Sequence, residues 1–95
     1  MNYTIWRYPL EITDRQTIKV PVGARLMCVK EELGILTTFW FVDPQKEQQE
    51  TEATFYIYIT GHPIPYKYIR HYVDSVVCNN GRLVWHIFCD YKWGM

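Results

Sequence analysis

The stretch that decides the fold is residues 69–90, which read IRHYVDSVVCNNGRLVWHIFCD. Apolar and polar residues alternate on both sides of an Asn-Asn-Gly turn at 79–81. Asn and Gly tolerate the positive φ angles that a tight hairpin turn needs. A two-residue loop then places Ser75 opposite His86. The stretch therefore predicts an antiparallel β-hairpin.

The same period of two continues through the rest of the chain and indicates further strands. They are expected at 2–9, 16–20, 25–32, 35–42 and 53–60. Pro21-Val22-Gly23-Ala24 and Leu33-Gly34 supply the turn chemistry between three of them. The pattern predicts one all-β domain over residues 1–95, an antiparallel sandwich or small barrel of about seven short strands.

Two stretches depart from simple alternation. Ile35 to Val42 is apolar on both faces, which is typical of a central strand covered from two sides. Residues 44–52 are rich in Gln, Glu and Lys and contain almost no apolar side chain. They predict a mobile polar loop, because such a segment cannot bury enough surface to order itself.

Charge and length narrow the class of protein. The chain has 95 residues, enough for one core, and ten basic residues cancel ten acidic ones. Without a basic stripe, duplex nucleic acid is disfavoured as a partner. There is no apolar run of membrane length and no secretory leader at the start, so we expect no membrane association.

Three cysteines, at 28, 78 and 89, lack any C-x-x-C spacing. The expected hairpin register puts Cys89 opposite Tyr72 and far from Cys78, so a bridge between these two thiols is disfavoured. Free cysteines fit a cytoplasmic protein.

The most unusual local string is Gly61-His62-Pro63-Ile64-Pro65. Two prolines and a glycine stiffen a loop, which presents His62 and exposed amides at low entropic cost. The alternative interpretation is a rigid turn whose histidine only contacts nearby backbone. His86, on a largely apolar strand face, is more typical of a satisfied structural histidine than of a base.

No motif predicts catalysis. His71 and His86 lie about four rungs apart in the expected hairpin, too far to share a metal. No cysteine has an evident histidine beside it, as a nucleophile requires. We expect no enzyme activity, no metal and no cofactor.

Tyrosine and tryptophan recur along the strands. Such rings can stack nucleobases, with arginine nearby for phosphate, or they can form a protein interface. Arg25 or Arg70 would supply the charge. The candidate ligand-binding residues are Tyr58, Thr60, Gly61, His62, Tyr66, Arg70, Trp85 and His86.

Several pieces of the chain, taken in order, resemble a family of small uncharacterised accessory proteins of tailed bacteriophages and prophages. These pieces are Ile5-Trp6-Arg7-Tyr8-Pro9-Leu10, Val22-Gly23-Ala24, Val42-Asp43, Thr60-Gly61-His62-Pro63 and Val84-Trp85-His86-Ile87-Phe88. The resemblance covers nearly the whole chain and brings no catalytic residues with it. It implies a phage protein that acts in the bacterial cytoplasm, where such proteins commonly counter host defence.

Three hypotheses follow. The first is a homo-oligomeric sponge that binds a small nucleotide-type immune signal without turning it over. The second is a protein–protein inhibitor of a host defence factor, with the aromatic residues as its hot spot. The third is a minor structural or assembly component of a phage.

Overall fold

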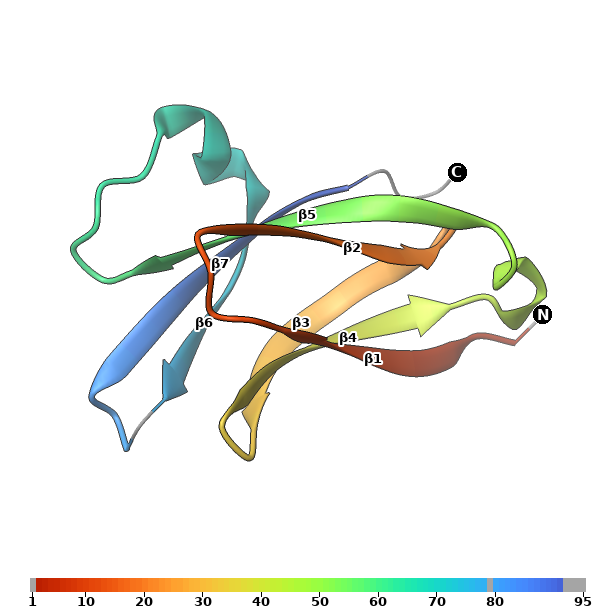
Figure 1. The fold of residues 1–95 in the computed structure, drawn as a ribbon. Helices are drawn as coiled ribbons and strands as arrows, with labels where there is room; N and C mark the ends of the chain where they lie inside the picture. The colour runs from red at the N-terminus through yellow and green to blue at the C-terminus, as the bar shows by residue number, and fades with distance from the viewer. Residues whose placement is uncertain (1, 79, 92–95) are drawn as a thin grey trace.

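The computed structural model describes residues 2–78 and 80–91 (Figure 1). Asn79, predicted to lie in the hairpin turn, is outside the described residues. The strands are β1 (Thr4–Leu10), β2 (Arg15–Pro21), β3 (Arg25–Glu32), β4 (Ile35–Val42), β5 (Glu50–Ile59), β6 (Tyr72–Cys78) and β7 (Leu83–Tyr91). Two short 3-10 helices are η1 (Pro44–Lys46) and η2 (Tyr66–His71). Within the described residues, no helix has the length and apolar character that a membrane span requires.

The strands form two antiparallel sheets and no closed barrel, so the all-β prediction is confirmed as a sandwich. One sheet has the order β1-β4-β3 and the other the order β2-β5-β7-β6. β4 is the central strand of the first sheet, as its apolar sequence predicted. The expectation that both of its faces are covered is wrong, because Ile35 and Phe41 on the outer face are exposed. The buried side chains between the sheets come from all seven strands and include Leu10, Val20, Val29, Leu36, Trp40, Phe55, Val76 and Ile87.

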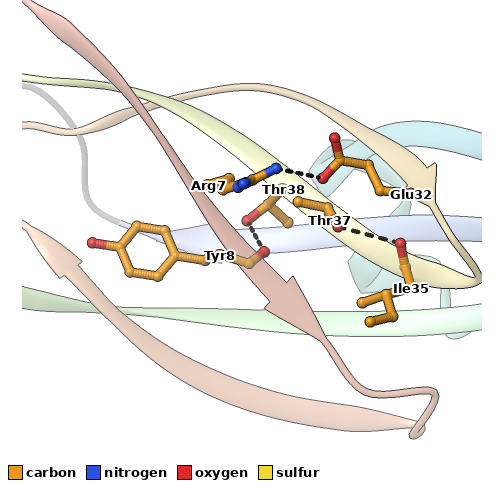
Figure 2. Close-up of polar contacts among 6 residues, drawn as sticks. All are labelled: Arg7, Tyr8, Glu32, Ile35, Thr37 and Thr38. Carbon is orange, nitrogen blue, oxygen red and sulfur yellow. Dashed lines mark hydrogen bonds and ion pairs between the residues drawn. The ribbon is translucent and has the colours of Figure 1, made fainter.

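Trp40 is the centre of this core and has no exposed surface. Its ring meets the rings of Tyr8, Phe55 and Tyr91 edge-on. Its Nε1–H donates a hydrogen bond of 2.8 Å to Oγ1 of Thr38. The Thr38 hydroxyl in turn donates to the carbonyl of Tyr8 at 2.8 Å (Figure 2). One threonine thus satisfies the buried indole and ties β4 to β1.

The two sheets are joined along one side, where β3 lies against the second sheet. The backbone N–H of Val29 donates to Oδ2 of Asp74 at 3.1 Å. The backbone N–H of Leu26 donates to the hydroxyl of Tyr91 at 3.1 Å. Side chains of β6 and β7 therefore satisfy donors at the edge of β3 that no strand pairs with.

The C-terminal hairpin follows the predicted register near its turn and departs from it further away. Ser75 pairs with His86, as expected. The register shifts between Tyr72 and Asp74, so Tyr72 pairs with Phe88 and the expected pairing with Cys89 is wrong. A bulge adds one residue to β6 there, and alternation alone does not reveal such an insertion.

Two segments differ from the sequence-based expectation. β5 begins at Glu50, inside the predicted 44–52 loop, because the polar residues Thr51 and Glu52 pair with β2. Residues 66–71, expected to lead into or belong to the last hairpin, form η2, so β6 begins only at Tyr72.

Candidate functional site

The segment 60–71, which links β5 to β6, folds over one end of the four-stranded sheet (Figure 1). Tyr68 of η2 stacks on Tyr56 of β5 with ring centroids 4.1 Å apart. Phe88 is buried between Tyr58 and Tyr72, which meet it edge-on. Several of the rings predicted to stack nucleobases therefore pack on one another and hold η2 against the sheet.

A chain of hydrogen bonds runs beneath this segment and is centred on His86 of β7. Its Nε2 shares a hydrogen bond of 2.7 Å with Oγ1 of Thr60. Its Nδ1 shares one of 2.8 Å with Oγ of Ser75. The Ser75 hydroxyl also bonds the hydroxyl of Tyr72 at 2.7 Å. Hydroxyl groups can donate or accept, so this chain suits either tautomer of the ring.

The Ser75–His86 pair lacks the third group of a catalytic triad. The hydrogen bonds of the Asp74 carboxylate go to the backbone N–H groups of Val29 and Ser75. Among the described residues, His86 is therefore held by two hydroxyl groups and by no carboxylate, the group that orients the histidine of a triad. The arrangement anchors the start of the 60–71 segment.

A solvent-open pocket of about 290 Å³ lies beside this chain. It is lined by Ile59, Thr60, Gly61, His62, Ile64, Tyr72, His86 and Phe88. Four of the predicted ligand-binding residues, Thr60, Gly61, His62 and His86, thus lie together. Tyr58 adjoins them, since its ring centroid is 5.6 Å from that of His62. The pocket is largely apolar, with two imidazoles and two hydroxyl groups at its wall.

The other predicted site residues lie elsewhere. Tyr66 and Arg70 line a separate hollow on η2 together with Lys67 and Ile69. Trp85 faces the interior, packs against the core and borders a third hollow. Arg25, expected as a source of charge, lies on β3 in the other sheet. Side chains alternate along β7, so Trp85 lies on the opposite face of the sheet from His86. The position of Arg70 depends on η2, which alternation did not predict.

The next features are the arrangement of the metal-ligating side chains and the state of the thiols. Within residues 2–78 and 80–91, no three His, Cys, Asp or Glu side chains are grouped as a metal site requires. All three cysteines are free. Burial raises the pKa of Cys89 and, to a lesser degree, that of Cys78, so both thiols are protonated at neutral pH.

One feature that sequence reasoning missed lies at the tip of the β3–β4 hairpin. Leu33 is 100% exposed and has a φ angle of 50°, in the left-handed region. Gly34 follows at φ 86°, and its N–H donates to Oε2 of Glu31 at 2.5 Å, which fixes the turn. Asn or Gly is the usual residue at such a turn position. The leucine at 33 is therefore the sequence signal that could have marked this turn as unusual.

The outer face of the three-stranded sheet β1-β4-β3 is also open to solvent. Ile5 of β1 pairs with Phe41 of β4 on this face, and they are 54% and 40% exposed. Farther along, Arg7 of β1 reaches across to Glu32 of β3 in an ion pair of 3.2 Å (Figure 2). The face is therefore apolar near one end and bridged by charge toward the other.

Comparison with known proteins identifies the family. Residues 1–93 match the domain of unknown function DUF7352, so the chain belongs to that family. Neither a search of curated proteins nor one of solved structures found a match.

Proposed function

We propose that this member of the DUF7352 family is a non-enzymatic binding protein that inserts the tip of its β3–β4 hairpin into an apolar pocket of another protein. Leu33 carries the proposal, since its side chain is fully exposed and its backbone is left-handed. No contact within the described chain accounts for an apolar side chain at this position.

The energetics favour an external partner for Leu33. A left-handed conformation costs a residue with a Cβ about 1–2 kcal/mol. Full exposure means that folding gains nothing from the leucine side chain, whereas its burial in a partner stabilises a complex by about 1.5–3 kcal/mol. The turn needs a left-handed residue at this position but not a leucine, and backbone strain of this kind clusters at functional sites.

The surroundings of Leu33 indicate the chemistry of the partner. Glu31 and Glu32 precede it, and Ile35, 51% exposed, follows two residues later. Glu32 is paired with Arg7, and the remaining carboxylate, that of Glu31, disfavours an anionic membrane surface or a nucleic-acid phosphate. The hairpin tip suits a protein whose apolar pocket has a basic rim. The resemblance to phage accessory proteins makes a defence protein in the bacterial cytoplasm the partner class.

A matched pair of variants tests this function. Tagged wild-type chain would capture proteins from a bacterial lysate, and each captured protein would be purified and titrated by calorimetry. Leu33→Asn is expected to weaken binding by about tenfold or more. Val77→Asn, which removes another exposed apolar side chain (58% exposed, on β6), is the control and should change affinity by less than about twofold.

Three results would overturn the proposal. Equal affinity of Leu33→Asn and wild type would remove the hairpin from the interface. Flotation with anionic vesicles that depends on Leu33 would make the target a membrane. Co-sedimentation with phage particles through the same residue would favour the structural role.

A second candidate function is capture of a small heteroaromatic ligand, such as the base of a nucleotide. It is supported by the convergence of Thr60, Gly61, His62 and His86 at one pocket of about 290 Å³. No Lys or Arg lines that pocket, so any recognition would centre on the base. Thermal shift with matched nucleosides and nucleotides tests it: both should stabilise wild type similarly, and His62→Ala should abolish the shift. An unchanged melting temperature across the panel would eliminate this candidate.

A further inference from the structure

The exposed edges of the two sheets are protected to different degrees. The edge of β3 is satisfied by Asp74 and Tyr91 from the second sheet. β2, an edge strand of the second sheet, exposes the cations Arg15 and Lys19, and charges on an edge discourage pairing with another chain. β1 is an outer strand of its sheet and is drawn below β4 on the right of Figure 1. The one cation of β1, Arg7, is paired with Glu32, and β6, the fourth edge strand, lies against β3. The edge of β1 is therefore the least protected of the four.

The backbone of β1 presents bonding groups at this edge. Pro9 has no N–H, so in an edge strand its nitrogen is expected to face away from the paired neighbour. The hydrogen bond from Thr38 shows that the carbonyl of Tyr8 is directed toward β4. This is consistent with a Pro9 nitrogen that faces the other way. Directions alternate along a strand, so Ile5 and Arg7 direct their N–H and C=O groups away from β4, as Pro9 does. Unpaired edge groups of this kind are a template for another strand.

We propose that β1 pairs antiparallel with β1 of a second copy of this chain, with the two-fold axis at Ile5, to form one continuous six-stranded sheet. This register places Ile5 opposite its own copy and Arg7 opposite Tyr3 of the second copy. An axis at Arg7 would oppose two guanidinium groups, which is unfavourable. An axis at Pro9 would lack the N–H groups that a central pair exchanges.

The side chains on the outer face favour the same register. Phe41 neighbours Ile5 within each copy, so the joined sheet carries an unbroken apolar row of Phe41, Ile5, Ile5 and Phe41. In the single chain, these side chains are 40% and 54% exposed. Arg7 is directed toward Glu32 of its own sheet, which keeps its charge away from the axis. The two-fold interface is self-complementary, as an isologous dimer requires.

This inference is independent of the proposed function. Leu33 follows β3 at the far end of the sheet, where Ile35 pairs with Glu32, whereas Ile5 pairs with Phe41 near the other end. The dimer therefore leaves the hairpin tip open. Loss of dimerisation would be seen in the molar mass, and loss of partner binding would be seen by calorimetry, so the two proposals fail separately.

Sedimentation equilibrium over a concentration series tests the dimer. Wild type is expected to change from monomer to dimer. Ile5→Lys keeps the backbone donor and opposes two ammonium groups across the axis, so it should raise the dissociation constant by about tenfold or more. Ile12→Lys, at an apolar residue exposed to a similar degree (51%) between β1 and β2, is the matched control and should dimerise like wild type.

Cross-linking tests the register. A hydrogen-bonded antiparallel pair brings Cα atoms to about 5.5 Å, within disulfide range. Ile5→Cys should form a covalent dimer on oxidation, whereas Arg7→Cys should not, because it faces Tyr3 of the second copy. The wild-type chain gives the background from its own thiols. A monomer at all concentrations, an unaffected Ile5→Lys dimer, or preferential cross-linking of Arg7→Cys would each overturn the proposal.

Discussion

The Nδ1 atom of His86 lies 2.8 Å from the Oγ atom of Ser75, its direct neighbour on the adjacent strand. The other ring nitrogen contacts Thr60, at the start of the segment that covers the sheet. His86 thus joins the C-terminal hairpin to that segment, and both His86 and Thr60 line the pocket beside this link.

Replacement of His86 by leucine is expected to lower the free energy of unfolding by about 1–2 kcal/mol, because two hydrogen bonds are lost at a partly exposed site. Thr60→Ala removes one of the two and should cost about half as much. Urea denaturation measures both. Unfolding free energies equal to wild type would mean that solvent replaces these bonds without loss.

Thr38→Val should destabilise the protein by about 1–3 kcal/mol, although it nearly preserves volume. The hydroxyl of Thr38 is the acceptor of the buried Trp40 indole N–H, and without it that donor has no partner. Thr38→Ser keeps the hydroxyl and is the control, with a smaller loss expected. Urea denaturation at neutral pH compares the three chains. A Thr38→Val chain as stable as wild type would contradict this account.

Asp74→Ala is expected to free the edge of β3 from β6. Bonds to a charged group contribute about 1.5–3 kcal/mol, so stability should fall by a similar amount. Amide exchange at Val29, the donor to this carboxylate, should become faster. The backbone N–H of Lys30, on the same edge strand, gives the comparison. Unchanged protection at Val29 would show that β3 stays against β6 without the Asp74 carboxylate.

The sequence predicted the strands best where alternation meets local turn chemistry. β3 and β4 begin and end at the expected residues, because Leu33-Gly34 marks their turn and alternation marks their faces. The prediction of strand bounds failed where tertiary pairing overrides composition. Thr51 and Glu52, for example, belong to β5 because they pair with β2. At the bulge near Tyr72, one added residue changes the register without a sequence signal.

The candidate site shows the same division. His62 and the Thr60-Gly61 pair are neighbours in sequence, and His86 reaches them because β5 and β7 pair, with Tyr58 opposite His86. Trp85 was grouped with them although alternation places it on the opposite face from His86. The role of Tyr56 and Tyr68, which stack on each other, depends on η2 folding back over the sheet.

Leu33→Asn is expected to raise the free energy of unfolding by about 0.5–1 kcal/mol, because asparagine tolerates the left-handed conformation better than leucine. The same substitution should weaken binding of a partner, which is the usual conflict between stability and function at a binding residue. Thermal and urea unfolding measure the gain. Ile35→Asn, at an exposed site within β4, is the control and should not stabilise the chain. A destabilised Leu33→Asn variant would mean that the leucine supports the fold.

Stability is expected to fall as the pH rises above about 9, and Cys89 is the main reason. Burial, with a smaller contribution from Asp90, raises the pKa of this thiol above its ordinary value of 9.0. Above pH 9, the unfolded chain loses this proton while the folded chain, with its higher pKa, keeps it. The free energy of unfolding therefore falls by up to about 1.4 kcal/mol per pH unit in this range. Cys89→Ala should show a shallower slope in urea denaturation from pH 8 to 10. Val76→Ala removes buried volume without a titratable group and should keep the wild-type slope. Parallel slopes in all three chains would assign the alkaline loss to other groups.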